Sequence, residues 1–263
     1  MDYTIGQVSK LLGLSIEGIR KYEKMGIIMP VRSTSDYRKY GYLDITALIR
    51  AKTYRSFGFS MKETSQLVND MKVPQIIDTL QEKRKELERE CAMVKAKTRL
   101  IDKKLNDLET LEQRLDQPEI RMIPGFYRFE FAQNGGISND HRVVLMFQKW
   151  MECIPFAHIS TRYSDSNTYG GLAMEEQYAK LFDIGENDLI RYFPGGLCAC
   201  VCVEETDNSV SNIACAQMLI DYAAYHRFEI SHELIGHSIT SIDKKNKYKR
   251  YREITAFILP KTT

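Results

Sequence analysis

The stretch YTIGQVSKLLGLSIEGIRKYEKMGI, residues 3–27, decides the fold of the N-terminal part. Thr4 and Gln7 have the spacing of a capping box, and apolar residues follow them at helical spacing. Gly13 ends this first helix, and Ser15 can cap a second one. Two short helices joined by a tight turn predict a helix-turn-helix, whose second helix can enter the major groove of DNA.

A turn flanked by two short strands is expected over 31–42, where the segment VRSTSDYRKYGY carries basic and aromatic side chains. Such a wing can reach the phosphate backbone of DNA. Two further helices are expected over 44–57 and 60–70. Asp44 would cap the first, and Ser60 would cap the second as part of a capping box. The N-terminal part is therefore predicted to be a winged helix-turn-helix.

Charge is distributed unevenly along the 263 residues, which carry a formal net charge of +2. Residues 1–73 have a net charge of +5, residues 74–118 are neutral, and residues 119–263 have a net charge of −3. This gradient suggests that only the first segment meets nucleic acid, although an excess of this size can also arise by chance. With 43% hydrophobic and 27% charged residues, the chain is expected to have packed cores.

Several classes of protein are disfavoured by what the sequence lacks. No apolar run approaches the roughly 18–20 residues that cross a bilayer, and the N-terminus does not resemble a signal peptide. We therefore expect a cytoplasmic protein without a membrane partner, whose six cysteines are reduced thiols. No phosphate-binding loop, dinucleotide fingerprint or serine nucleophile elbow is present, so no cofactor is expected and the protein is not expected to be an enzyme.

A long helix is predicted between Pro74 and Pro118, where Glu, Lys, Arg and Leu dominate. With Ile77 at heptad position a, nine of the twelve a and d positions are apolar. This seam consists of Ile77, Leu80, Arg84, Leu87, Cys91, Val94, Thr98, Ile101, Leu105, Leu108, Glu112 and Leu115. It is typical of a coiled coil, so a second copy of the chain is the expected partner. The alternative is a helix that folds back on its own C-terminal domain.

At this point the sequence resembles the MerR family of regulators over roughly its first 70 residues. The matching motifs are YTIGQVSKLLGLS (3–15), IRKYEKMGI (19–27), Pro30, Arg32, DYRKY (36–40) and SFGFSMKE (56–63). The family usually has two adjacent tyrosines after the recognition-helix arginine, and here Lys21 replaces the first. Asp36 stands where a glycine is common in the wing.

The resemblance implies a set of DNA contacts. Arg20 and Tyr22 would contact DNA from the recognition helix, and Lys21 could take over the phosphate contact of the missing tyrosine. Tyr37, Arg38 and Tyr40 would act from the wing, although Tyr37 and Tyr40 could also simply pack it. The resemblance further implies a homodimer through an antiparallel coiled coil, a palindromic promoter operator, and RNA polymerase as a partner at the promoter.

Residues 119–263 are predicted to alternate strands and helices, with each half in the order strand, helix, strand, strand. Strands are expected at 120–131, 157–163, 169–174, 189–193, 197–205, 229–240 and 248–259, and helices at 141–154 and 210–227. This order resembles a GyrI-like effector-binding domain. PGGLCACVCVEE (194–205), HELIGHSI (232–239) and KRYREITAFILP (249–260) are similar to stretches of BmrR-type multidrug sensors.

A ligand cavity is implied by this second resemblance, with Glu233 and Ile235 facing it and Tyr251 nearby. A buried carboxylate is costly to ionise and awaits a cation, which aromatic rings attract as well. Glu233 could instead be an ordinary carboxylate on a solvated strand face. An aromatic residue of such sensors is replaced here by Cys198, so Phe147, Trp150, Tyr192 and Phe193 are proposed to supply aromatic contacts.

Two motifs invite other interpretations. His232 and His237 are five residues apart in a predicted strand, whereas a zinc protease needs histidines four apart on a helix, so no metal site is expected there. Cys198, Cys200 and Cys202 share one strand face and could bind a soft metal, but buried cysteines commonly act as small apolar residues.

The sequence therefore predicts an α+β multidomain protein. It would have a winged helix-turn-helix head (1–73), a coiled-coil dimerisation helix (74–118) and a duplicated β-α-β-β, GyrI-like domain (119–263). The expected function is a dimeric transcription activator that responds to a small lipophilic, cationic ligand. The family resemblance implies that the liganded dimer distorts an over-long promoter spacer. The alternatives are a metal or thiol-redox sensor, a hydrolase with Glu233 as general base, and a nucleoid-type DNA-binding protein without a ligand.

Overall fold

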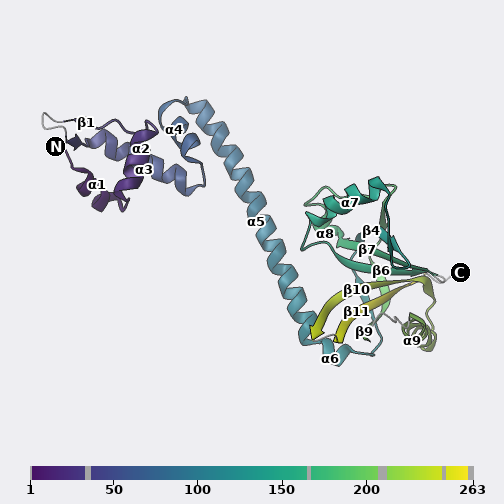
Figure 1. Ribbon diagram of the computed structural model, residues 1–263. Helices are drawn as coiled ribbons and strands as arrows, with labels where there is room; N and C mark the ends of the chain where they lie inside the picture. Colours follow the sequence, from purple (N-terminus) through teal and green to yellow (C-terminus); the bar gives the residue numbers. More distant parts are fainter. Residues whose placement is uncertain (1, 33–36, 165–166, 207–211, 245–246, 260–263) are drawn as a thin grey trace. The chain divides into compact units, whose positions relative to one another are not determined.

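The computed structural model describes residues 2–32, 37–164, 167–206, 212–244 and 247–259 (Figure 1). The chain folds into two compact units, Met1–Cys91 and Ala92–Thr263. Their boundary falls inside one continuous helix, α5 (Val73–Glu109), which contributes residues to both units. The predicted division into 1–73, 74–118 and 119–263 treats this helix as a separate dimerisation segment. That division stays a prediction.

The first unit begins with the predicted helix-turn-helix. Its elements are α1 (Ile5–Leu12), α2 (Ile16–Lys24), β1 (Val31–Arg32), β2 (Arg38–Lys39), α3 (Tyr42–Ser56) and α4 (Met61–Asn69). Thr4 and Gln7 form the expected capping box, and the Ser15 side chain accepts a hydrogen bond from the Gly18 N–H. The antiparallel pair β1–β2 forms the base of the wing. Asp36 lies outside the described residues.

Helix α3 starts earlier than predicted, because Asp44 is not its N-cap. Gly41 precedes the first turn, and the Asp44 carboxylate accepts a hydrogen bond from the Gly41 N–H at 2.9 Å. Asp44 thus occupies the third helical position, where a carboxylate also satisfies a free N–H and interacts favourably with the helix dipole. Helix α4 has the predicted capping box between Ser60 and Glu63.

Helix α5 carries apolar residues on two different faces. The a and d seam is largely exposed, with 62% of Val94 and 59% of Ile101 accessible. Met93, Ala96 and Leu100 lie on another face and pack against a core of the second unit. The face of α5 that carries Met93, Ala96 and Leu100 therefore packs on the C-terminal domain, and the a and d seam stays uncovered.

The predicted helix to Pro118 is interrupted after Glu109. A short helix, α6 (Leu111–Arg114), follows, and Leu115 adopts an extended conformation that forms a bridge to Cys202. Leu111 and Leu115 pack with Cys202 and Ile239. The seam prediction was therefore wrong at Leu115, because docking on the sheet competes with continuation of the heptad pattern.

The second unit is built on one antiparallel sheet, in the order β3-β9-β11-β10-β6-β7-β4-β5, with β8 also paired to β4. Its strands are β3 (Glu119–Ile123), β4 (Phe126–Gln133), β5 (Gly136–Ile137), β6 (His158–Ser164), β7 (Asn167–Glu175), β8 (Ile190–Phe193), β9 (Gly196–Thr206), β10 (Ile230–Lys244) and β11 (Lys247–Ile258). The order strand, helix, strand, strand occurs twice, as β4-α7-β6-β7 and β9-α9-β10-β11. In each set the last strand lies between the other two, and the sets meet where β6 pairs with β10.

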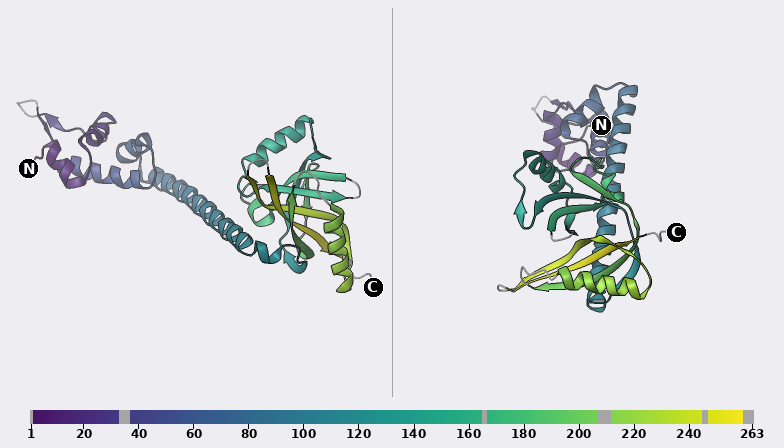
Figure 2. Two further views of the ribbon diagram at one scale, coloured as in Figure 1. Left: turned by 60° about the horizontal axis from the view of Figure 1, so that its bottom comes forward. Right: turned by 90° about the vertical axis from the view of Figure 1, so that its right-hand side faces the viewer.

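Two helices, α7 (His141–Met151) and α9 (Asn212–Tyr225), each lie alongside one half of the sheet, whereas α8 (Glu176–Ala179) is a single turn (Figure 2). Trp150 of α7 packs with Phe129 and Leu172 of the first half. Leu219 of α9 packs with Val201 and Ile254 of the second half. Because side chains alternate along a strand, the neighbouring residues of these strands project to the opposite face.

The predicted strand 120–131 is in fact two strands. Pro124 and Gly125 separate β3 from β4, because proline lacks the N–H that a ladder needs. The chain also comes very close to itself here, since a Cβ on Gly195 would lie 2.8 Å from the Gly125 nitrogen. The remaining predicted strands and helices of this unit agree with the structure within four residues at each end. Among the described residues, no helix is long and apolar enough to cross a membrane.

Candidate functional site

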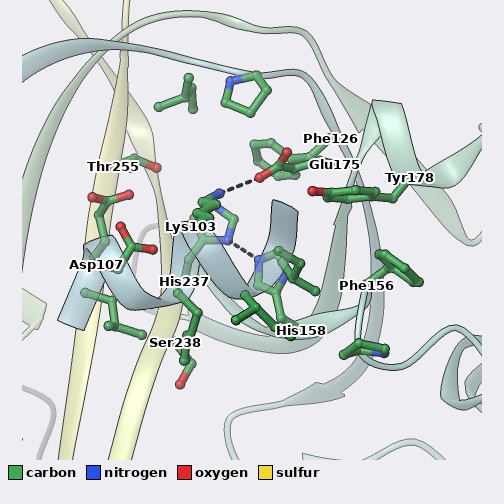
Figure 3. A pocket seen from close by; sticks show the side chains of 18 of the residues that line it. Lys103, Asp107, Phe126, Phe156, His158, Glu175, Tyr178, His237, Ser238 and Thr255 are labelled. Carbon is green, nitrogen blue, oxygen red and sulfur yellow. Dashed lines mark hydrogen bonds and ion pairs between the residues drawn. The ribbon is translucent and has the colours of Figure 1, made fainter. Parts of the chain in front are cut away.

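The second unit contains a cavity of about 480 Å³ between the C-terminal half of α5 and the open face of the sheet (Figure 3). Aliphatic residues, prolines and aromatic rings make up much of its wall, including Leu100, Ile123, Phe126, Phe156 and Tyr178. Its charged and polar lining residues are Lys97, Lys103, Lys104, Asp107, Arg121, His158, Glu175, His237, Ser238, Glu253 and Thr255. A cavity of this size and mixed character suits a small, largely apolar molecule with one polar group.

An ion pair between Lys103 and Glu175 crosses the cavity and links α5 to the end of β7 (Figure 3). The amide of Gln177 donates a second hydrogen bond to the Glu175 carboxylate, at 2.7 Å. Burial works to raise the pKa of Glu175, but the Lys103 ammonium and these hydrogen bonds outweigh it and lower the pKa. Glu175 is therefore a buried anion, and its cationic partner, Lys103, lies on α5.

Two other carboxylates line the cavity in different electrostatic environments. Glu253 lies between the guanidinium groups of Arg114 and Arg121 and hydrogen-bonds to both. Asp107 lies 3.6 Å from the Arg114 Nη1 and forms no side-chain hydrogen bond among the described residues. Burial raises the pKa of Asp107 despite its cationic neighbours. Glu253 is thus already neutralised, whereas Asp107 is a carboxylate with little compensation.

Two histidines, His158 on β6 and His237 on β10, meet inside the cavity. The His158 Nε2 lies 3.1 Å from the His237 Nδ1, as the dashed line in Figure 3 marks. The ring of His237 also meets the ring of Phe126 edge-on, with the centroids 5.1 Å apart. From the sequence, His237 itself was weighed only as a possible zinc ligand, so this pair was missed. Its signal was the alternation that places Glu233, Ile235 and His237 on one strand face.

None of the seven residues predicted to bind the ligand lines this cavity. Glu233 projects into a charged network, where it pairs with Arg162 and Arg191 at 3.0 Å each. Ile235 is fully buried beside the cavity wall, in a cluster with Phe126 and Phe193. These residues share the sheet face with the cavity, but other side chains already occupy the space around them.

The five aromatic residues predicted to bind the ligand contact other parts of the fold instead. Trp150 is fully buried and packs on Phe129, and Phe147 packs on Phe131 with ring centroids 4.8 Å apart. The hydroxyl of Tyr192 donates to Glu176 at 2.8 Å, and the hydroxyl of Tyr251 donates to Glu204 at 2.9 Å. Phe193 stacks on Phe126, which is the lining residue.

The cysteine-rich strand β9 does not present reactive thiols. Cys198, Cys200 and Cys202 are all buried. Burial raises the pKa of Cys198 and Cys200 to about 12 and that of Cys202 to about 11. Because soft metals bind the thiolate, protonated thiols are poor ligands. The described ranges contain no group of three or more histidines, cysteines, aspartates or glutamates arranged to hold a metal ion.

The first unit exposes some of the residues predicted to contact DNA and buries others. Arg20 and Lys21 are exposed on α2, and Tyr37 is exposed at the wing. Arg38 is half-buried, and its Nε donates to Glu23 at 2.8 Å. Tyr22 and Tyr40 lie in the core, so neither offers the surface contact predicted for it. Tyr22 follows Ile19 by three residues on the same helix face, and that face points inward.

Comparison with known proteins identifies this first segment. Residues 4–40 match the model of the MerR family regulatory protein. The N-terminal segment is therefore similar to the MerR family. The match ends with the wing, so it covers neither the long helix nor the domain with the cavity.

Curated relatives resemble the same N-terminal segment. A probable heavy metal-dependent transcriptional regulator of Haemophilus influenzae is 48% identical over 65 residues, which are 24% of this chain and 51% of that protein. The HTH-type transcriptional regulator HmrR of Sinorhizobium medicae is 42% identical over 65 residues, 24% of this chain and 44% of that protein. This chain thus spans about half the length of these relatives.

Among solved structures, similarity extends over most of the chain but is loose. A cryo-EM structure titled as an EcmrR-DNA complex aligns with 97% of this chain and 99% of its own, at 18% identity and a TM-score of 0.40. The isolated C-terminal domain of EcmrR aligns with 54% of this chain and 97% of its own, at 15% identity and a TM-score of 0.37.

Proposed function

We propose that this protein is a homodimeric transcription regulator that activates a promoter when a lipophilic cation fills the cavity of its second unit. The observation that carries the proposal is that α5, the wall of the cavity, starts in the unit that contains the MerR-family segment. A ligand that contacts Leu100 or displaces Lys103 therefore acts on a helix that leads directly to that unit. In this proposal the protein binds its ligand in the cytoplasm and does not convert it chemically.

DNA binding is assigned to the exposed side chains of the first unit. Arg20 and Lys21 project from the recognition helix α2, and Tyr37 and Arg38 come from the wing. Arginine can form paired hydrogen bonds with guanine, whereas lysine neutralises phosphates. Glu17 lies 3.3 Å from Lys21 in an exposed pair, which is weak enough to exchange for a phosphate.

Dimerisation is assigned to the exposed seam of α5. Leu87, Val94, Ile101, Leu105 and Leu108 are all at least 40% exposed and fall on one helix face. Each Å² of apolar surface removed from water contributes about 25 cal/mol, so a seam of this length can stabilise a coiled coil substantially. We propose the antiparallel arrangement, which places two recognition units on a palindromic operator.

The second unit is proposed to be a GyrI-like effector domain, on the basis of its two strand–helix–strand–strand sets. Its ligand is proposed to be a lipophilic cation, as first inferred from the sequence, but with different carboxylates. Glu175 and Asp107 line the cavity, whereas Glu233 does not. Phe126, Phe156 and Tyr178 contribute aromatic rings to the cavity wall, and the face of an aromatic ring attracts a cation.

Activation follows if the ligand favours one dimer conformation over the other. A cation that binds Glu175 competes with the Lys103 ammonium and releases α5 from the end of β7. The released helix allows the dimer to distort an over-long promoter spacer so that RNA polymerase can engage it. Deforming the DNA costs free energy, which the difference in ligand affinity between the two dimer conformations must offset.

The ligand-binding part of the proposal is tested with fluorescence titrations of a lipophilic-cation panel and size-matched neutral compounds. Glu175→Gln should weaken cation binding about ten-fold or more and leave neutral compounds unaffected. Glu176→Gln is the matched control, because this neighbouring carboxylate pairs with Lys180 and Tyr192 outside the cavity. Equal cation binding by all three proteins would contradict the assignment of Glu175.

The DNA-binding part is tested by selecting duplexes from a random pool with the full-length protein. We expect enrichment of a palindromic sequence, and binding that weakens steeply with salt. Arg20→Ala should weaken binding to the selected sequence about ten-fold or more, whereas Arg142→Ala, which removes an exposed arginine of the second unit, should not. Failure to enrich any sequence would contradict specific recognition.

A further inference from the structure

Part of α5 belongs both to the wall of the cavity and to the exposed seam. Ile101 lines the cavity, is exposed, and occupies a d position of the seam. Lys97 and Lys104 also line the cavity and are exposed, and each directly precedes an a position, so both are g positions that flank the seam. Residues that line a cavity and are also exposed lie where the cavity meets solvent. One border of its mouth is therefore the flank of the proposed dimer interface.

The seam within α5 has a symmetry that selects one register for an antiparallel pair. In such a pair the a residues of one helix lie opposite d residues of the other. A two-fold centre between Ala92 and Met93, here called the centred register, gives every a and d residue of α5 an opposite number. Ile77, Arg84, Cys91, Thr98 and Leu105 of one copy then lie opposite, in that order, Leu108, Ile101, Val94, Leu87 and Leu80 of the partner subunit.

Shifting the pair by one heptad in either direction removes apolar contacts. One shift leaves Ile77 and Leu80 without an opposite residue in α5, and the other leaves Leu105 and Leu108 without one. Each Å² of apolar surface that stays in water forfeits about 25 cal/mol of stabilisation. The centred register therefore buries the most apolar surface of the three.

The charges beside the seam favour the same register. In an antiparallel pair the g positions of the two helices face each other, and so do the e positions. In the centred register Lys97 faces the partner's Glu90, and Lys95 faces the partner's Glu88, and the two-fold symmetry repeats both pairs. The shifted registers would instead bring Lys97 against the partner's Lys97, or Glu90 against the partner's Glu90. Opposite charges thus meet in the register that also pairs the whole seam.

One pair of like charges remains in the centred register, between Lys104 and the partner's Lys83. The Lys83 side chain is largely buried within its own copy, with its ammonium 2.5 Å from the Glu86 carboxylate. The same ammonium lies over the ring of Phe59, 5.2 Å from the centroid. Because the charge of Lys83 is already compensated, its repulsion of Lys104 is weak.

We infer that a second copy of the chain completes the ligand cavity. In the centred register α5 of the partner runs beside the mouth, where the partner's Glu90 pairs with Lys97 and the partner's Arg84 packs on Ile101. This inference rests on the proposed function, which makes the seam the dimer interface and the cavity the ligand site. It adds the register and an outer wall for the cavity. A ligand that reaches Ile101 then contacts a layer of the coiled coil, and through it the partner copy.

Arg84 suits a place at the mouth of the cavity. In the single chain its side chain is exposed, and its Nε lies 3.4 Å from the Glu88 carboxylate in an exposed pair that contributes little to stability. The aliphatic part of an arginine can cover an apolar neighbour while its guanidinium stays in water. A polar residue at an a position also commonly fixes the register of a coiled coil, at some cost in stability.

Cysteine pairs test the register in the full-length protein. Arg84→Cys and Ile101→Cys are introduced separately and together into a Cys91→Ser background, and the proteins are oxidised with copper phenanthroline. The double variant should form covalent dimers on a non-reducing gel, because its two cysteines lie opposite each other across the interface. Neither single variant should do so, because the centred register separates each position from its own copy by about 25 Å along the helix axis.

Two further cysteine pairs are matched controls. Arg84→Cys combined with Val94→Cys, or with Leu108→Cys, would cross-link only in one or the other of the shifted registers. Both control proteins should therefore stay uncross-linked. A parallel coiled coil would reveal itself differently, because each single-cysteine variant would then cross-link to its own copy.

Charge exchange tests the contact at the mouth without cysteines. Glu90→Lys and Lys97→Glu should each raise the dimer dissociation constant several-fold in sedimentation equilibrium, since each places like charges opposite each other twice. The double variant should restore much of the wild-type value, because the pair is then only reversed. Arg99→Glu reverses an exposed charge at a b position, away from the seam, and should leave dimerisation unchanged.

The outcomes separate this inference from the proposed function. Cross-linking of the pair at 84 and 101, with rescue in the double charge variant, supports the inference. A dimer that cross-links instead through a control pair or a single cysteine, or whose charge variants show no rescue, overturns it and leaves the seam as the interface. A wild-type protein that stays monomeric overturns the proposed dimer and the inference together.

Discussion

Glu233 accepts a hydrogen bond from the Arg162 guanidinium, with 3.0 Å between the Glu233 Oε1 and the Arg162 Nη1. Arg191 binds the same carboxylate, and Arg162 in turn binds Glu130 and lies over the ring of Tyr169 at 3.9 Å. Glu233 is therefore one member of a network in which each charge already has a partner. A carboxylate held by two arginines has little affinity left for a cationic ligand.

Glu233→Gln should lower the stability of the protein without weakening ligand binding. The substitution leaves Arg162, whose side chain is only 13% exposed, with one carboxylate partner fewer. Because Glu233 itself is 31% exposed, we expect a loss of about 1 kcal/mol, measured by urea unfolding. Cation affinity should stay within about two-fold of the wild-type value. A large loss of affinity would return Glu233 to the ligand site.

The location of the cavity could be predicted only in part from the sequence. Alternation along 230–239 places Glu233, Ile235 and His237 on one face, and this is the face that lines the cavity. The pattern does not reveal where along that face the cavity lies. That depends on Arg162, Arg191 and Lys103, which come from distant segments and pair with the carboxylates there. Which carboxylate is neutralised and which is accessible depends on those long-range partners.

The head was more predictable, because its signals are local. The capping box at Thr4 and the N-cap at Ser15 involve residues three positions apart, and the structure has both. The interruption of the long helix after Glu109 was not predictable, since it depends on Leu111 packing against Ile239 of a distant strand. The burial of Tyr40 has a similar cause, because its backbone pairs with Tyr3 at the start of the chain.

Gly171→Ala should destabilise the second unit. A Cβ at this position would lie 2.4 Å from the carbonyl oxygen of Phe129 and 2.9 Å from the guanidinium of Arg128. Arg128 is almost fully buried and donates to the Tyr169 carbonyl and the Ser160 hydroxyl, so it has little freedom to move. We expect a loss of about 1–3 kcal/mol in urea unfolding.

Gly185→Ala is the control for this prediction, because a Cβ at Gly185 would meet nothing within 4 Å. It should leave stability nearly unchanged. If both substitutions have the same small effect, the close packing of Arg128 against Gly171 is not important for stability.

Val94→Asp should dissociate the proposed dimer. Val94 occupies a d position of the seam and is 62% exposed in the single chain, so the monomer should tolerate a carboxylate there. In a coiled coil the same carboxylate would be buried against apolar residues of the second copy, at a cost of several kcal/mol. Sedimentation velocity should show a shift from dimer to monomer. Ala92→Asp changes an exposed residue outside the seam and should remain dimeric, and a Val94→Asp protein that stays dimeric would rule out this seam as the interface.

Lowering the pH from about 6.5 toward 4 should destabilise the second unit through its two half-buried histidines. The pKa values of His158 and His237 are lowered in the folded protein, from an ordinary value of 6.5 to about 4 for His158. As the pH falls below about 6.5, the unfolded chain binds protons at these two histidines and the folded chain does not. Their contribution to stability is therefore complete above pH 6.5 and is lost progressively toward pH 4.

Urea unfolding at about pH 7, 6 and 5 measures this loss, and the comparison of wild type with His237→Phe isolates the histidine contribution. The variant has one titrating group fewer, so its stability should fall less steeply with decreasing pH. The comparison is needed because Asp107 and Glu205, whose pKa values are raised by burial, act with the opposite sign and stabilise the folded protein as the pH falls. Parallel curves for the two proteins would show that His237 is not held neutral by the fold.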